Sequence, residues 1–397
     1  MGPPAAPQVS RAPVPARRRK ISRPPVANAL DCATLPPAMT PRPNKPSVSA
    51  LEALERAQWI AFAPFVFQAS CVLRDRGVLS AIESSPEGLT LEQIAEQVSL
   101  PHYGVRVLLE AGLGIGLVTE DDERRYHLTN TAHYLQHDGM TRANMDFTRD
   151  VNYAGIAHLD QAIATGKPAG LQVFGEWPTI YAGLAKLPEQ VQGSWFGFDH
   201  FYSDSAFPVA LPLVLKSKPR RLLDIGGNTG KWAIACMQHD PEIEVTIMDL
   251  PGQLDVAKAN IAAAGLSDRV RFLAVDLLDE QAKIPGGFDV IWMSQFLDCF
   301  SEAEIVTILR RCAAALEGDA RIFILETFWD RQRFAAAKFC LQMTSLYFTA
   351  LANGNSQLYR ADVFLECVRQ AELEVDAEHD GIGLAHTLLS CRRQGAS

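Results

Sequence analysis

The stretch Arg221–Gly230, which reads RLLDIGGNTG, decides the fold class of this chain. The first five residues, Arg221–Ile225, are mostly apolar and predict a buried strand. The glycines that follow predict a sharp turn into a helix over residues 231–238. Glycine also lets a backbone approach a ligand closely. Because a carboxylate nearly abuts the glycines, we expect this loop to face a cation or a hydroxyl group rather than a phosphate.

Short apolar strands and helical stretches alternate through the rest of the C-terminal half. Strands are predicted over residues 245–249, 270–274, 289–293 and 321–326, and helices over residues 253–264 and 302–316. This alternation predicts an α/β domain over residues 213–397, with a doubly wound parallel sheet and right-handed crossovers. Such sheets bind ligands at the carboxyl ends of their strands.

Two further acids follow the next two strands. Asp249 ends the second strand, 19 residues after Gly230, where a carboxylate can accept both hydroxyls of a ribose. Asp276 follows the third strand and is placed to accept a hydrogen bond from an adenine amino group. Each acid alone is an ordinary loop residue, but three carboxylates in this order describe an adenosine pocket that carries a positive charge. This combination fits S-adenosylmethionine.

Residues 49–140 are predicted to form a separate, mainly helical domain. Apolar residues at spacings of three and four predict an amphipathic helix from Leu51 to the region of Leu79. Pro64 lies inside it, so we expect a kink there or two shorter helices. Further helices are predicted after the N-cap residues Thr90 and Ser99.

A glycine-rich break after these helices precedes a predicted β-ribbon over residues 116–119 and 125–129. Two helices followed by a ribbon are typical of a winged helix. Its second helix has few basic residues and the tip of the ribbon is acidic, so a DNA-binding regulator is the weaker hypothesis. The stronger one is a dimerisation domain that buries the apolar face of the helix beginning near Leu51.

The composition excludes several classes of protein. The chain has 397 residues, of which 48% are apolar, and a net charge of −9, which suits one large globular domain or two ordinary ones. No apolar segment reaches the roughly 20 residues of a membrane span. The eight cysteines form no CxxC pair and no metal-ligand cluster stands out. We therefore expect a cytoplasmic protein with no metal, no nucleic-acid partner and no membrane partner.

The first 48 residues differ from the rest of the chain. They hold 12 of the 24 prolines and eight Lys or Arg residues against a single acid, Asp31. Such a segment has too few large apolar side chains to offset the entropy of ordering. We expect residues 1–48 to form a disordered Pro/Arg-rich tail.

At these motifs the chain resembles the class I O-methyltransferases of the plant phenolic and bacterial polyketide type, over roughly residues 50–393. The most specific pieces are Leu223–Gly230, Asp249-Leu250-Pro251 and Asp276-Leu277-Leu278. The resemblance implies a Rossmann-like S-adenosylmethionine-binding domain and an N-terminal winged-helix domain that forms an intertwined homodimer. The implied cofactor-binding residues are Asp224, Gly226, Gly227, Gly230, Asp249, Leu250, Asp276, Leu277 and Ser294.

The catalytic position departs from the family. The family's general base is a histidine, and the matching residue here is Asp298 in Leu297-Asp298-Cys299-Phe300. The glutamate that usually orients this histidine falls near Leu358. A carboxylate of pKa about 3.9 is a weaker acceptor of a phenolic proton than an imidazole of about 6.5, by roughly 3.5 kcal/mol. Burial can recover part of this deficit. The candidate catalytic residues are Asp298, His200 and His386.

An aromatic segment over residues 195–202 falls where the family builds its acceptor pocket, in a helical linker over residues 141–212. The first hypothesis is therefore methyl transfer to an oxygen of a small phenolic or polyketide-like acceptor in secondary metabolism. Methylation of an aromatic carbon ortho to a phenol stays open. Because the usual histidine is replaced, a rearrangement, decarboxylation or cyclisation without methyl transfer also stays open.

Overall fold

The computed structural model describes residues 48–279 and 281–395. The chain divides into two units between Ala63 and Pro64. The tail predicted over residues 1–48 lies outside the described residues, apart from Val48. In the first unit, residues 48–63 hold the beginning of helix α1 (Ala50–Asp75), on which large apolar side chains are exposed.

Helix α1 continues through Pro64 without interruption, so the expectation of two helices divided there is wrong. The chain turns instead at Gly77, which has a φ of 76° and precedes α2 (Val78–Glu83). A positive φ costs glycine little, because it has no Cβ.

The predicted helices and ribbon follow. They are α3 (Leu91–Gln97), α4 (His102–Ile115), β1 (Val118–Glu120) and β2 (Tyr126–Leu128). Thr90 and Gln93 form a capping box at the start of α3. The glycine-rich break predicted over Gly112, Gly114 and Gly116 begins only at Gly116, because α4 continues through the first two glycines to Ile115. A Cβ on Gly112 would lie 3.1 Å from a methyl group of Val118, so this glycine permits close packing of α4 against β1.

A series of helices leads from the ribbon to the sheet. They are α5 (Asn130–His137), α6 (Gly139–Phe147), α7 (Leu159–Thr165), α8 (Ile180–Gly183) and α9 (Glu189–Val214). Apolar side chains of α6, α8 and the beginning of α9 are buried in one core together with α13 (Ala335–Tyr347), which comes late in the sequence, whereas Ala132 of α5 is buried in the core of the preceding helices.

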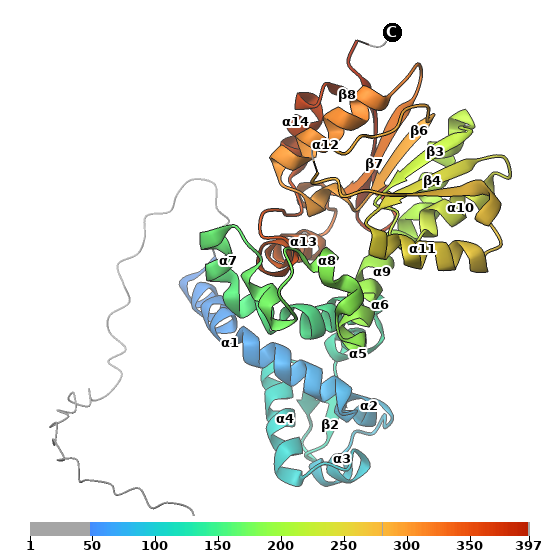
Figure 1. Ribbon diagram of the computed structural model, residues 1–397. Coiled ribbons are helices and arrows are strands. Elements are labelled where there is room, and N and C mark those ends of the chain that lie inside the picture. The colour runs from blue at the N-terminus through green and yellow to red at the C-terminus, as the bar shows by residue number, and fades with distance from the viewer. Residues whose placement is uncertain (1–47, 280, 396–397) are drawn as a thin grey trace, which may run out of the picture. The chain divides into compact units, whose positions relative to one another are not determined.

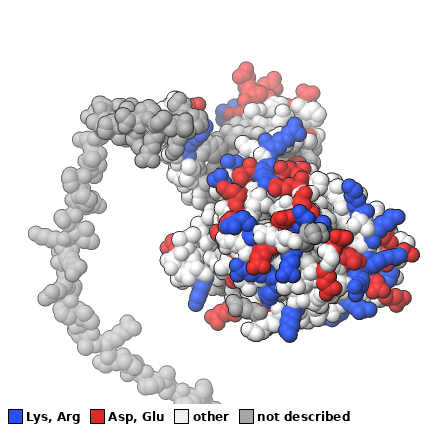
Figure 2. Space-filling model, turned by 90° about the horizontal axis from the view of Figure 1, so that it is seen from above, with Lys and Arg blue, Asp and Glu red and all other residues white. Residues whose placement is uncertain are grey.

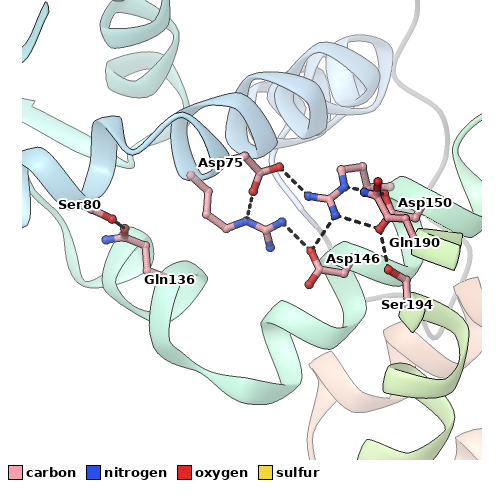
Figure 3. Close-up of polar contacts among 9 residues, drawn as sticks. Asp75, Ser80, Gln136, Asp146, Asp150, Gln190 and Ser194 are labelled. Carbon is pink, nitrogen blue, oxygen red and sulfur yellow. Dashed lines mark hydrogen bonds and ion pairs between the residues drawn. The ribbon is translucent and has the colours of Figure 1, made fainter. Parts of the chain in front are cut away.

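An ion-pair network joins the end of α1 to the beginning of α9 (Figure 3). Arg149, in the turn Thr148–Asn152, donates to Asp75 at 2.6 Å and to both oxygens of Asp150 at 2.7 and 2.8 Å. Asp150 also accepts hydrogen bonds from Ser194 at 2.6 Å and from Gln190 at 3.1 Å.

The C-terminal half forms a seven-stranded sheet in the order β5-β4-β3-β6-β7-β9-β8. The strands are β3 (Arg221–Ile225), β4 (Glu244–Asp249), β5 (Val270–Ala274), β6 (Val290–Ser294), β7 (Arg321–Thr327), β8 (Leu373–Ile382) and β9 (His386–Arg393). The first five are parallel, as predicted. The prediction of a wholly parallel sheet is wrong, because β9 runs antiparallel to both β7 and β8. The connection of three residues between β8 and β9 is too short for a parallel crossover.

Helices cover both faces of this sheet (Figure 1). The helices α10 (Lys231–His239) and α11 (Pro251–Ala263) bury their apolar sides in one core, together with the end of α9. The helices α12 (Glu302–Ala315) and α14 (Ala361–Gln370) bury theirs in a second core on the other face. This is a doubly wound arrangement, whose ligands bind where the strand order reverses, here beside β3.

Charged side chains of both signs are interspersed on the face shown in Figure 2. An extended basic surface, the usual electrostatic mark of nucleic-acid binding, is not seen on that face. Among the described helices, none has both the length and the apolar character needed to cross a bilayer.

Candidate functional site

A cavity of about 610 Å³ opens at the carboxyl ends of β3, β4 and β6. Its walls come from the glycine loop after β3, from the loops after the neighbouring strands, and from α8, α9 and α13. This volume is in the range of binding sites for cofactors and other small molecules. Every predicted cofactor-binding residue lines it except Gly230, which begins α10 beside it.

The glycine loop is packed too tightly for side chains. Gly226 has a φ of 72°, and a Cβ there would lie 2.2 Å from the ring of Phe296. A Cβ on Gly227 would lie 2.7 Å from a methyl group of Ile247. Gly226 N–H donates to the carbonyl of Met248 at 2.8 Å, which fixes the loop against β4. The two glycines therefore bring bare backbone to the cavity wall.

Asp224 is a buried carboxylate with an unsatisfied atom. Its side chain is 2% exposed, and Oδ2 has no hydrogen-bond partner. Burial, and then the charge of Asp249, raise the pKa of Asp224 to about 8. A ligand that brings a cation or a donor to this oxygen would satisfy it and favour the ionised form.

Asp249 is held by the backbone. Its Oδ2 accepts from Asn228 N–H at 2.8 Å and its Oδ1 from Leu250 N–H at 2.7 Å, while burial raises its pKa. These bonds orient the carboxylate at the cavity wall. Asp276 is exposed and accepts from Leu278 N–H at 2.9 Å.

These residues fit the predicted cofactor. Besides Asp224, the buried polar atoms Asn228 Oδ1 and Ser294 Oγ have no partner, and both residues line the cavity. Hydroxyl and ammonium groups of a ligand would satisfy such atoms. Several carboxylates at one wall would repel a phosphate, so a nucleoside that carries a positive charge suits the cavity.

Aromatic rings line the other end of the cavity. Phe147 and Phe198 stack with their ring centroids 4.0 Å apart, and Trp195 Nε1 donates to Tyr347 Oη at 2.8 Å. Of the aromatic segment predicted over residues 195–202, Trp195, Phe198 and Tyr202 line the cavity, whereas Phe196 and Phe201 are not among its lining residues. Phe300, Tyr347 and Phe348, from later in the chain, line it as well.

Asp298 lies at this aromatic end. It sits in a 3-10 turn, Leu297–Cys299, just after β6, and is 7% exposed at the cavity wall. Burial raises its pKa to about 7, and the Cys299 thiol donates to Oδ1 at 3.4 Å. A carboxylate with this pKa can accept a proton at neutral pH much better than an exposed one.

Sequence reasoning missed Glu326, which supports the turn of Asp298. At the end of β7, its Oε1 accepts from the N–H groups of Phe296 at 3.0 Å and Leu297 at 2.8 Å. Burial, and then Asp298, raise the pKa of Glu326 well above its usual range. An acid at the carboxyl end of an apolar strand was the signal that could have identified it.

The two candidate histidines lie in different surroundings. His200 lines the cavity, with Nε2 3.5 Å from Thr229 Oγ1, and burial lowers its pKa. His386 is fully buried in β9 and does not line the cavity. Its Nε2 lies 2.9 Å from Oε1 of Gln295, and burial lowers its pKa to about 4. At neutral pH, His386 is therefore an uncharged support for Gln295.

Two protein-family models match parts of this chain, and several known methyltransferases are similar to it. A Dimerisation2-like domain model matches residues 55–126, and an O-methyltransferase domain model matches residues 210–362. The chain is 25% identical to the L-tyrosine C(3)-methyltransferase of Streptomyces lavendulae over 334 residues, which covers 83% of this chain and 90% of that protein.

Two further methyltransferases are also similar to this chain. Phenazine-1-carboxylate N-methyltransferase of Pseudomonas aeruginosa is 26% identical over 63% of this chain and 72% of its own length. The crystal structure of SibL, an S-adenosylmethionine-dependent methyltransferase in its apo form, superposes with a TM-score of 0.66. That comparison has 26% identity and covers 86% of this chain and 99% of SibL.

Proposed function

We propose that this chain, which belongs to the S-adenosylmethionine-dependent methyltransferases with a Dimerisation2-like domain and an O-methyltransferase domain, methylates an oxygen of a small phenolic or polyketide-like acceptor. The observation that carries the proposal is the single cavity that joins the glycine loop to an aromatic chamber containing Asp298.

The residues around the glycine loop would hold the cofactor. Asp249 would accept hydrogen bonds from the ribose hydroxyls, Asp276 and Leu277 would contact the adenine, and the backbone at Gly226 and Gly227 would lie along the methionine part. Asp224 would offer its unsatisfied oxygen to a positively charged part of the ligand. When bound, S-adenosylmethionine supplies an activated methyl group, so the protein's main task is to position the acceptor.

Asp298 is the proposed proton acceptor. A phenolic O–H directed at its carboxylate would give up its proton to Oδ2, while the oxygen gains the methyl group. The aromatic walls would orient the ring, and Glu326 would hold the turn that carries Asp298. His200 is the second candidate base because it lines the same cavity.

Methylation of an aromatic carbon is the second candidate function. The first relative named above is an L-tyrosine C(3)-methyltransferase, and its acceptor carbon lies ortho to a phenol. In this chain, deprotonation of a phenol by Asp298 would activate its ortho carbon to take the methyl group, and that carbon would then lose its own proton to restore the aromatic ring. A reaction without methyl transfer remains a prediction. In that case the chain would bind the cofactor, and a labelled methyl group would stay on the cofactor.

The N-terminal region completes the proposal. The helices α2, α3 and α4 with the ribbon β1–β2 support a winged-helix-like domain, and the Dimerisation2-like match supports a homodimer. One relative is a phenazine-1-carboxylate N-methyltransferase, which supports a small aromatic acceptor here, and a role in secondary metabolism remains a prediction. A cytoplasmic location remains a prediction.

Calorimetric titration tests the proposal. We expect micromolar binding of S-adenosylmethionine and of S-adenosylhomocysteine, lost in Asp249→Ala and kept in Asp255→Ala, an exposed acid of α11. Labelled methyl should then pass to members of a phenolic acceptor panel. Failure of both ligands to bind would overturn the cofactor assignment, and binding without any transfer would favour the reaction that leaves the methyl in place.

A further inference from the structure

Three potential metal ligands meet outside the cavity. Glu83 ends α2, while His133 and His137 lie one turn apart on α5. One ligand atom from each residue lies within 4.8 Å of the other two. Glu83 Oε1 is 2.8 Å from His133 Nδ1, and Glu83 Oε2 is 2.7 Å from His137 Nε2.

We propose that Glu83, His133 and His137 form a Zn²⁺ site that joins α2 to α5. Two histidines at positions i and i+4 of a helix present both rings to one ion, and a carboxylate from a second element supplies the third ligand. With three protein ligands, the fourth tetrahedral position would hold water. Both histidine side chains are about half exposed, so an ion can reach them from solvent.

The surroundings of Glu83 support a site rather than two separate hydrogen bonds. Gln136 is 7% exposed, and its Nε2 donates to Glu83 Oε2 at 3.2 Å. Gln136 Oε1 in turn accepts from Ser80 Oγ at 2.8 Å (Figure 3). A buried amide thus orients the carboxylate, in the way that outer residues of metal sites orient the ligands.

The choice of metal follows from the donor atoms. Two imidazoles and one carboxylate suit Zn²⁺ and similar transition metals, whereas Mg²⁺ and Ca²⁺ require mostly oxygen ligands. The site is distinct from the cavity, whose lining includes none of these three residues. The expectation that the chain offers no metal-ligand cluster missed this group, because Glu83 is 50 residues from His133 in the sequence. Zinc would act as a cross-link within the N-terminal region, with no part in methyl transfer.

The test uses the full chain, purified without a histidine tag and treated with a chelator. Titration with ZnCl₂ should show one saturable equivalent, and Co²⁺ should give the visible absorption of tetrahedral coordination. We expect His133→Ala and His137→Ala each to weaken Zn²⁺ binding by about tenfold or more, because loss of a ligand should weaken binding at least as much as loss of a residue that only orients a ligand. Because ligand binding stabilises the folded state, Zn²⁺ should raise the melting temperature of the wild type but not of the double variant.

His127→Ala is the matched control, because His127 pairs with a single carboxylate, Asp121 at 2.7 Å, in the same region. It should leave zinc binding unchanged. Unaltered circular dichroism and S-adenosylmethionine affinity in each variant would show that the fold is retained. Absence of saturable binding in the wild type, or equal binding by the wild type and the His133→Ala/His137→Ala double variant, would overturn the proposal.

Discussion

Burial changes the chemistry that Asp298 can perform. An exposed aspartate is almost fully ionised at neutral pH and is a poor acceptor of a phenolic proton. At 7% exposure its pKa rises to about 7, which is close to the usual value of a histidine, about 6.5. The raised pKa of Asp298 is therefore compatible with a base at this position.

Replacing Asp298 by Asn tests this role. The carboxylate accepts a proton only when it is ionised, so the turnover rate of the wild type should rise with pH and level off above about 7. Asp298→Asn should lower kcat by about 10²–10⁴ and remove this pH dependence. Steady-state rates between about pH 5 and pH 9, roughly two units on either side of the pKa of about 7, measure both effects. If Asp298→Asn keeps the wild-type pH profile, the proton acceptor would be His200 instead.

Glu326 is expected to act as a positioning residue. Burial, and then Asp298, raise the pKa of Glu326 well above the usual range, which favours the uncharged carboxyl group, so an uncharged amide of the same shape is its conservative replacement. Glu326→Gln keeps an oxygen for the N–H groups of Phe296 and Leu297 and should retain most of kcat. Glu326→Ala leaves both donors without a partner, so the turn carrying Asp298 should shift and kcat should fall by about tenfold or more. The pH profile of the Gln variant should match the wild type, and equal losses in both variants would contradict a positioning role.

At the scale of elements, the network around Arg149 links α1 to the helix that carries Trp195. Arg149 contacts Asp75 and Asp150, and Asp150 accepts from Ser194, the neighbour of a cavity-lining ring. Asp150 is only 8% exposed, so removal of the guanidinium leaves a nearly buried carboxylate without its cation.

Arg149→Met should therefore destabilise the fold by about 2 kcal/mol, the typical loss of a hydrogen-bonded charge. Urea unfolding followed by circular dichroism measures this change. Arg369→Met is the matched control, because Arg369 forms only an exposed pair with Glu366 within α14, and it should leave the midpoint unchanged. Equal midpoints for the two variants would argue against a structural role for the network.

At the scale of the whole molecule, helix α1 carries the strongest indication of a partner. Leu51 and Ile60 are 65% and 76% exposed, although both are large and apolar. Exposed apolar side chains on one helix mark an interaction surface, and the Dimerisation2-like match begins at residue 55 in this helix.

The double variant Leu51→Glu/Ile60→Glu should dissociate the proposed dimer. Burial of one such side chain contributes about 2 kcal/mol, and twofold symmetry counts each substitution twice. We expect the dissociation constant to rise by at least about 100-fold, since about 1.4 kcal/mol corresponds to a factor of ten. Sedimentation velocity measures it, with Val256→Glu, at an exposed position of α11, as the control. A wild-type chain that sediments as a monomer would contradict the homodimer.

The sequence alone determined the elements whose pattern is local. Alternating apolar strands and helices placed β3 to β7 within a residue or two, because strand and helix periodicity arise from neighbouring residues. The glycine loop was identified for the same reason, since tight turns require glycine at particular positions. The antiparallel strand β8 was missed, because its exposed polar residues do not alternate clearly with apolar ones.

Only the tertiary structure decided which distant residues share a site. Glu326 meets the turn of Asp298 because β6 and β7 are neighbours in the sheet, and Glu83 meets His133 because α2 and α5 lie together. Burial likewise depends on the whole fold, and it separates His200, at the cavity wall, from His386, behind Gln295. A sequence pattern records which side chains are available, whereas their pKa values and contacts depend on the neighbours and the solvent exclusion that packing creates.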